Sequence, residues 1–368
     1  MPRKGPQVRS PAHAVYLHPV LSVATLALIG GGAYASIAFF GDPNAAGPRA
    51  IVKLTPVAEG PLRAPLADVV IDPSLDAIDE APLGEAQVHM ADASDKPAVE
   101  PLPAAPFQGL SVSGPNGQLP VMGPGGLTSY KAYRRPFTPD PRKSKIGVIV
   151  GGLGFNAAAT EQAISELPPE ITLSFVPYAQ NLQSWIDKAR AAGHEVMIEV
   201  PMEPFDMDED TGPQTLLAGL DAKSNVSRLE YLLGRAVGYF AVMNYQGAKF
   251  STSPTATPPV LKALKDRGLA LVGNGLGPRS ALGAEATKQG LPFASADRVL
   301  DIRRDAEAID DQLLNLEALA LQNGSALGAG FAYPVTIEQI KFWADGLKER
   351  GYQLAPASTV MDLRAKPK

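Results

Sequence analysis

The sequence has no cysteine and little histidine. The absence of cysteine among its 368 residues excludes thiolate nucleophiles, disulfides and cysteine-based zinc sites. The four histidines are His13, His18, His89 and His194, and only His194 falls in the part of the chain with a globular pattern. A metal site with two histidines is therefore excluded within one domain, and a Ser-His-Asp triad would need His194. Its place at the start of a predicted strand indicates instead a turn residue bonded to the backbone.

Strong charge and aromatic residues are also missing from much of the chain. The net charge of −5 is mild and argues against nucleic acid as the main partner. Residues 41–143 are poor in aromatics and contain 17 of the 35 prolines. Such a segment buries too little apolar surface to offset the entropy lost on ordering, which predicts a disordered linker. One globular domain, residues 144–368, is left with enough chain to build a substantial core.

A single long hydrophobic run lies near the N-terminus. Arg3, Lys4 and Arg9 precede an apolar run from Val20 to Phe40, which is close to the roughly 20 residues that cross a bilayer. The charge distribution predicts a cytoplasmic segment 1–18 and a transmembrane anchor 19–40. We therefore expect a single-pass protein of a bacterial inner membrane with its domain in the periplasm. The alternative is a signal peptide cleaved after Ala33–Ala35, with secretion to the periplasm.

From residue 145 on, apolar runs alternate with amphipathic stretches. One helix pattern begins at Thr336, which is expected to cap it, and ends at Gly351. Seven or eight strands alternating with helices predict an α/β fold of the (β/α) barrel type, with function on the loops at the carboxyl ends of the strands. The expected strands are residues 146–150, 171–176, 195–200, 239–243, 270–272, 298–302, 326–329 and 353–355.

The first of these strands runs into a glycine-rich turn. The sequence is KIGVIVGGLGFNAAAT, Lys145 to Thr160, and Gly152, Gly154 and Ala157 match a relaxed dinucleotide-binding pattern. That pattern also needs an acidic residue after the second strand, where this chain has Pro177 and Tyr178. A nucleotide-binding module at Gly151–Gly154 is therefore the weakest of three functional hypotheses.

Several strand-end sequences resemble those of the divergent polysaccharide deacetylase family. In order, they are IVGGLG, LPPEITLSFVPYA, AAGHEVMIEVPMEP, GPQTLLAGL, VMNYQGAKFS and GFAYPVTIEQIKFWADGLKERGYQLAPAS. The resemblance spans nearly all of residues 145–360. It implies a distorted (β/α) barrel of the carbohydrate-deacetylase type that holds a divalent metal and acts on envelope polysaccharide.

The sequence departs from the family pattern at the positions of its chemistry. Where the resemblance implies a paired Asp-Asp, this chain has Gly151 and Gly152, and Gly273 replaces a further Asp. Glu199, Tyr245 and Phe331 stand where the family pattern has histidines. No cofactor is therefore expected, because the ligands of the implied metal are missing.

The remaining polar and aromatic residues suggest what the site could do. Glu199 and Glu203, with Asp206 and Asp210 nearby in sequence, are candidates for acid–base catalysis or a hard cation; alternatively, Glu203 only pairs within its loop. Aromatic and amide side chains at strand ends could stack on sugar rings and bond hydroxyls, or could simply plug the barrel mouth. These binding candidates are Tyr178, Asn244, Tyr245, Gln246, Phe331 and Tyr333.

Three functions therefore remain open at this point. The first is an exported, membrane-anchored and catalytically degenerate domain that binds envelope polysaccharide, a peptidoglycan-derived glycan or an envelope protein. The second is an active carbohydrate deacetylase or hydrolase with a rewired site at Glu199 and Glu203. The third is the nucleotide-binding module at Gly151–Gly154.

Overall fold

The computed structural model describes residues 99–206, 208 and 210–365. The predicted anchor at residues 19–40 lies outside the described residues, as does most of the predicted linker. Within the described ranges, no helix combines the length and hydrophobicity needed to cross a bilayer. The membrane anchor therefore stays a prediction.

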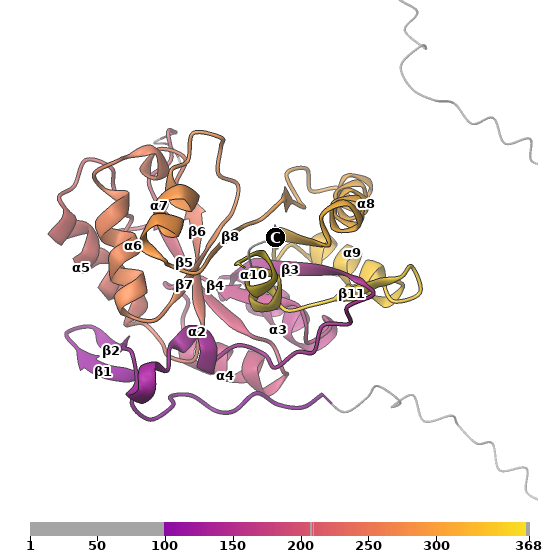
Figure 1. The fold of residues 1–368 in the computed structure, drawn as a ribbon, viewed down its shortest axis with the longest axis horizontal. Coiled ribbons are helices and arrows are strands. Elements are labelled where there is room, and N and C mark those ends of the chain that lie inside the picture. Colours follow the sequence, from indigo (N-terminus) through magenta and orange to yellow (C-terminus); the bar gives the residue numbers. More distant parts are fainter. Residues whose placement is uncertain (1–98, 207, 209, 366–368) are drawn as a thin grey trace, which may run out of the picture. The chain divides into compact units, whose positions relative to one another are not determined.

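Parallel strands form a curled half-barrel (Figure 1). Their order is β8-β7-β6-β5-β4-β3-β10-β9, and the short β11 also pairs with β3. The strands are β3 (Ser144–Leu153), β4 (Thr172–Phe175), β5 (Val196–Met202), β6 (Ala241–Gln246), β7 (Ala270–Gly273), β8 (Phe293–Ser295), β9 (Arg298–Val299), β10 (Ser325–Phe331) and β11 (Tyr352–Leu354). The predicted alternation of strands and helices is confirmed.

The two edge strands explain why the barrel is only partly formed. β8 and β9 are separated by just Ala296 and Asp297, and they pair with β7 and β10 respectively. Residues 293–299 therefore form one extended segment that pairs first with β7 and then with β10. Each pairing is short, so the two edges of the sheet are only weakly joined. The predicted strand 298–302 is too long, since β9 ends at Val299 and the Ile302 side chain is 78% exposed. The sequence analysis missed β8 because three residues leave no periodic pattern.

Helices cover the outside of the half-barrel, with α5, α6 and α7 on one side and α8 and α9 on the other (Figure 1). Asn156, Asp221 and Asp305 cap α3, α5 and α8 by accepting backbone N–H groups. The helices are α3 (Ala157–Glu166), α4 (Leu182–Ala191), α5 (Ala222–Leu233), α6 (Thr257–Asp266), α7 (Leu282–Gln289), α8 (Ala306–Asn323), α9 (Pro334–Asp345) and α10 (Ala357–Ala365), with a 3₁₀ turn η2 (Phe250–Thr252). Tyr333, not the predicted Thr336, is the N-cap of α9.

Side chains alternate between the helix-facing side of the sheet and its interior. Ile149, Met197, Met243 and Ala329 belong to the buried cluster inside the half-barrel. Because strand side chains repeat every two residues, the next interior positions along these strands come at their carboxyl ends. Those positions are Gly151, Glu199, Tyr245 and Phe331.

The amino-terminal end of the half-barrel is closed by residues 99–143. Leu110, Tyr130 and Tyr133 are buried in the interior cluster, next to the hairpin of β1 (Ser111–Gly114) and β2 (Gly117–Pro120), the turn η1 (Pro124–Gly126) and α2 (Ser129–Ala132). The predicted linker boundary at residue 143 is therefore wrong for this segment. A few large side chains placed over an open barrel end bury enough apolar surface to order a segment of low average hydrophobicity.

Arg190 in α4 ties this segment to the sheet. Its guanidinium is 2% exposed and donates hydrogen bonds to the carbonyls of Pro103, Tyr133 and Gly238 at 2.8–3.1 Å. Burial lowers the pKa of Arg190. The Arg190 charge is thus stabilised by three backbone carbonyls and not by a carboxylate, and these hydrogen bonds hold residues 99–143 against the sheet.

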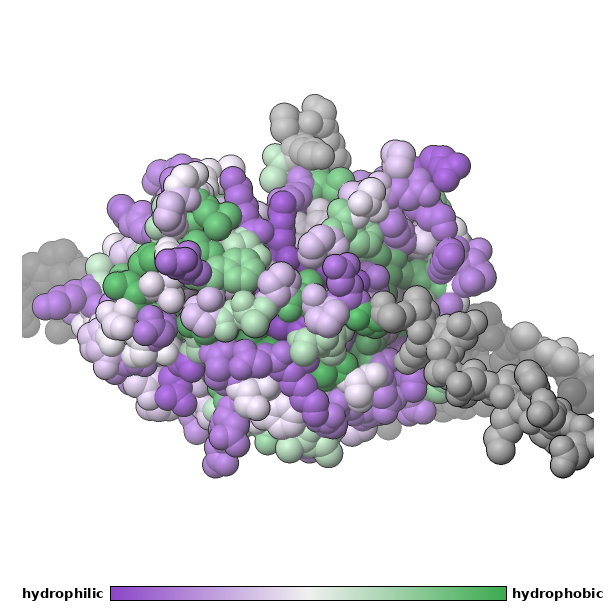
Figure 2. Space-filling model, turned by 90° about the horizontal axis from the view of Figure 1, so that it is seen from below, coloured by the Kyte–Doolittle hydropathy of each residue, from purple (hydrophilic) through white to green (hydrophobic). Residues whose placement is uncertain are grey.

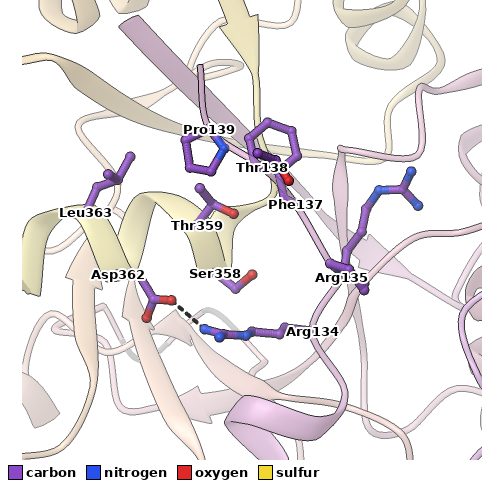
Figure 3. Close-up of a pocket in the computed structure, with 10 residues that line it drawn as sticks. Arg134, Arg135, Phe137, Thr138, Pro139, Ser358, Thr359, Asp362 and Leu363 are labelled. Atoms are coloured by element: carbon purple, nitrogen blue, oxygen red, sulfur yellow. Dashed lines mark hydrogen bonds and ion pairs between the residues drawn. The ribbon is translucent and has the colours of Figure 1, made fainter. Parts of the chain in front are cut away.

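A hollow of about 570 Å³ lies between residues 134–139 and α10 (Figure 3). Figure 3 shows Arg134 reaching toward Asp362, with which it forms an ion pair. Beside it, the fully buried Glu195 carboxylate accepts hydrogen bonds from the Ser358 hydroxyl and from Thr172. The polar groups around this hollow thus bond to one another and fasten α10 to the barrel. On the face shown in Figure 2, hydrophilic residues separate the hydrophobic ones into small areas.

Candidate functional site

A cleft of about 810 Å³ opens at the carboxyl ends of the strands. Gly152 of β3, Glu199 and Pro201 of β5, Tyr245 and Gln246 of β6, and Phe331 of β10 contribute to its wall. Loops add Phe155, Tyr178, Asp210, Asp301, Arg304 and Tyr333. Parallel α/β sheets place ligand sites at this end of their strands.

Glu199 is the most buried acid of this cleft, with 2% of its surface exposed. Its Oε1 accepts the Gly152 N–H at 2.6 Å. Burial raises the pKa of Glu199 to about 7, and the bond from Gly152 opposes that rise only in part. At neutral pH the group is therefore poised between its two protonation states.

Glu199 also occupies space that a side chain at position 151 would need. A Cβ added to Gly151 would lie 2.6 Å from Glu199 Oε1 and 3.0 Å from Met243 Cε. Gly152 has a φ of +73°, in the left-handed region that favours glycine. The two glycines and Glu199 therefore form one packed arrangement.

Aromatic side chains line one side of the cleft. The rings of Tyr245 and Phe331 meet edge to face with centroids 6.1 Å apart, and Phe331 lies 6.3 Å from Tyr333. The Arg304 guanidinium stacks 4.2 Å from the Tyr333 ring centroid. Tyr178 lines the cleft too, and its hydroxyl accepts the Gln214 N–H at 3.0 Å. These rings are half-buried and border an open cleft. They therefore offer flat surfaces to a ligand and do not plug the mouth of the half-barrel.

The two predicted amide residues have different roles. Asn244 is 1% exposed and its side chain bonds to the Gln246 and Asn274 backbones, so it joins the ends of β6 and β7 and does not line the cleft. Gln246 does line the cleft and has a φ of +56°. Non-glycine residues in this conformation are uncommon and cluster at functional sites.

Glu203 lies apart from this cleft. Its carboxylate accepts the Ala218 N–H and pairs with Lys249 Nζ, both at 2.7 Å. It lines a smaller hollow of about 340 Å³ that it shares with Asp210. The Asp206 carboxylate accepts the Asp208 N–H within its own turn. Ala218 lies in the same loop as Glu203, whereas Lys249 follows β6, so the Glu203 carboxylate joins the loops after β5 and β6.

Asp301 is a cleft residue that the sequence analysis missed. It is 5% exposed, and its Oδ2 accepts the Phe331 N–H at 2.6 Å and the Thr336 hydroxyl at 3.1 Å. Its Oδ1 is buried and has no hydrogen-bond partner among the described residues. Burial raises the pKa of Asp301. It was counted within the predicted strand 298–302, and its position near the carboxyl end of that strand was the available signal.

The glycine turn is not arranged as a phosphate site. The Gly152 N–H donates to Glu199, and the Gly154 N–H donates to the Thr160 hydroxyl at 2.9 Å. A phosphate-binding turn needs these amides free to point at an anion. A carboxyl group already bonded at the turn disfavours a second anion there, and with it the nucleotide hypothesis.

A match to a family model fits this architecture. Residues 148–361 match the model described as "Divergent polysaccharide deacetylase", which is more than half of the chain. The chain belongs to the divergent polysaccharide deacetylase family. The α/β class and the cleft at the strand ends agree with the resemblance, but the sheet is a curled half-barrel and not the full barrel that it implies.

Similar proteins include three that have no assigned activity in their names. A crystal structure of an uncharacterized protein from Agrobacterium tumefaciens C58 is 36% identical, with a TM-score of 0.65 over 66% of this chain and 99% of that one. An uncharacterized protein of Haemophilus influenzae is 22% identical over 56% of this chain and 73% of its own length. Uncharacterized protein YibQ of Escherichia coli K12 is 23% identical over 59% of this chain and 65% of its own length.

The cleft does not fit the divalent metal that the family resemblance implies. Of the replaced positions, Gly152, Glu199, Tyr245 and Phe331 line the cleft, whereas Gly273 does not. Carboxylates and histidines are the usual ligands of such a metal, and the described residues contain no group of three or more suitable side chains. His194 is fully buried, with its ring nitrogens 2.8 and 3.2 Å from the carbonyls of Ile171 and Ile164, as the sequence predicts.

Proposed function

We propose that this domain binds carbohydrate of the bacterial envelope in the cleft and does not deacetylate it. The supporting observation is the row of Tyr245, Phe331 and Tyr333 along the cleft, with Tyr178 also in its wall. Sugar rings have apolar faces that pack on aromatic rings, while hydroxyls need polar partners at the edges. Gln246, Glu199 and Asp301 are among the polar residues that line the cleft.

The loss of deacetylation follows from the residues at the strand ends. Metal-assisted hydrolysis needs a cation that polarises the acetyl carbonyl and activates water. Here aromatic rings and the Glu199 carboxyl fill positions where the family pattern has metal ligands. What persists is a cleft shaped by the same strands and lined with groups suited to binding.

The location of the domain is part of the proposal. The basic segment before the apolar run Val20–Phe40 supports a single-pass anchor in the inner membrane with the domain in the periplasm, and cleavage after Ala33–Ala35 would release it there. Either route brings the cleft to envelope polysaccharide or peptidoglycan. An envelope protein is the alternative partner.

A second candidate function is acid–base hydrolysis centred on Glu199. A carboxyl group with a pKa of about 7 suits proton transfer at neutral pH. Glu203 is a poor second member of such a pair because Lys249 and the Ala218 N–H engage its oxygens.

Calorimetric titration of the full-length chain with peptidoglycan fragments and chito-oligosaccharides tests the binding proposal. We expect saturable binding that weakens about tenfold in Tyr245→Ala, since stacking of one ring contributes roughly 1–1.5 kcal/mol. Phe342→Ala is the matched control, because Phe342 is 60% exposed on α9 and does not line the cleft. Equal effects of the two substitutions, or no binding at all, would contradict the proposal.

A further inference from the structure

The charged groups of the cleft are mostly acidic. Glu199, Asp210 and Asp301 line it, and Arg304 is the one basic residue among the described lining residues. Arg304 is exposed and stacked on Tyr333 at the rim. The cleft therefore has a negative bias that is strongest in its depth, where Glu199 and Asp301 are buried.

Both buried acids have unused capacity to accept hydrogen bonds. Glu199 receives one hydrogen bond, from Gly152, within the part of the chain that the structure describes. Asp301 Oδ2 is fully engaged, but its Oδ1 is buried with no partner among the described residues. A buried carboxylate with few donors and no directly paired cation is costly, so a ligand that supplies a positive donor would stabilise both groups.

The aromatic wall favours the same kind of ligand. A cation within about 6 Å of a tyrosine or phenylalanine ring face is attracted to the ring. Tyr245 and Phe331 thus suit a ligand that combines a sugar ring with a positive charge, whereas the Tyr333 ring already holds the Arg304 guanidinium.

We infer that the cleft selects amine-bearing sugars, such as de-N-acetylated glucosamine units, over their N-acetylated counterparts. The inference rests on the proposed carbohydrate binding and adds the class of sugar. The ammonium group of such a unit would lie against Glu199 and Asp301, while the sugar ring packs on Tyr245 and Phe331. An acetamide in its place carries no charge and adds no counter-charge to either carboxyl group.

Competing titrations of the full-length chain test this selectivity. The probes are a glucosamine tetrasaccharide and an N-acetylglucosamine tetrasaccharide at near-neutral pH, measured by calorimetry. We expect at least tenfold tighter binding of the glucosamine oligomer, because a hydrogen bond to a charged group contributes roughly 1.5–3 kcal/mol. Glu199→Gln should remove most of this preference while binding of the acetylated oligomer changes little.

Asp301→Asn provides a second, independent variant, since an amide can still accept the Phe331 N–H, and it should reduce the preference as well. Glu349→Gln is the matched control, because Glu349 is exposed and does not line the cleft. Equal or tighter binding of the acetylated oligomer by the wild type would overturn the inference and leave carbohydrate binding intact. Binding of neither oligomer would overturn this inference together with the proposed function.

Discussion

Replacement of Glu199 by glutamine should change how the stability of the domain depends on pH. The folded state holds the pKa of Glu199 at about 7, compared with an ordinary value of 4.5. Between these two values the unfolded chain releases the proton while the folded chain keeps it, so the free energy of unfolding falls as pH rises. Each tenfold change in proton affinity corresponds to about 1.4 kcal/mol, which gives a loss of about 3 kcal/mol across this window.

Below the window both states are protonated and the loss disappears; above it both are ionised and the loss is constant. Glutamine has nearly the shape of the protonated side chain and can still accept the Gly152 N–H. Glu199→Gln and wild type should therefore be equally stable near pH 4, and the variant should be more stable by about 3 kcal/mol near pH 8.

Urea unfolding followed by circular dichroism at a series of pH values measures the difference directly. The contributions of Glu195 and Asp301, whose pKa values are also raised by burial, cancel in the comparison. Glu349→Gln, an exposed change of the same charge, should follow the wild-type curve. A difference between wild type and Glu199→Gln that stays flat from pH 4 to pH 8 would refute the burial argument.

Three further predictions follow from packing. Gly151→Ala should destabilise by about 1–3 kcal/mol through overlap with the Glu199 carboxyl, and in a double-mutant cycle Glu199→Ala should recover much of that loss; additive effects would contradict the overlap. Arg190→Met should lower the free energy of unfolding by about 3 kcal/mol, because three buried carbonyls lose their donor. The loss should appear as a lower urea midpoint, and an unchanged midpoint would contradict a structural role for these hydrogen bonds. Removal of residues 99–143 also removes Tyr130 and should expose the rest of the interior cluster, such as Met197 and Phe240, giving insoluble or dye-binding protein in place of a cooperative unfolding transition.

Most of the sheet could be predicted from the sequence because its strands are continuous apolar runs. Residues 146–150 and 326–329, for example, are buried on both faces of a parallel sheet and leave an unmistakable signal. Strand β8 and the split between β8 and β9 could not be predicted, since segments of two or three residues owe their conformation to neighbouring strands and not to their own pattern.

The segment 99–143 shows a different limit of sequence reasoning. Its composition is typical of a linker, because it is as rich in proline as the preceding residues, and residues 41–143 were considered as one stretch. Order in this segment depends on a few positions, Leu110, Tyr130 and Tyr133, that meet the open end of the barrel. Average composition cannot reveal such tertiary contacts.

The sequence predicts a site residue well when its side-chain type and its position at a strand end are enough to fix its role. Tyr245 and Phe331 take interior positions at the ends of β6 and β10, which are not neighbours in the sheet, and the curl of the sheet brings their rings together. The roles of Asn244 and Glu203 could not be decided from the sequence, because whether a polar side chain bonds to the backbone or to a ligand depends on which atoms lie within hydrogen-bond distance. Asp301 needed the bend after β9 to bring it to the cleft.

The central claim is that the cleft binds sugar without deacetylating it. Acetate release from acetylated chito-oligosaccharides and peptidoglycan fragments, measured with the purified full-length chain and added divalent metals, tests this most directly. We expect no acetate release above that of a protein-free control, in the same samples that bind the sugars by calorimetry. Catalytic acetate release that is lost in Glu199→Gln would contradict it and establish an active enzyme at this cleft.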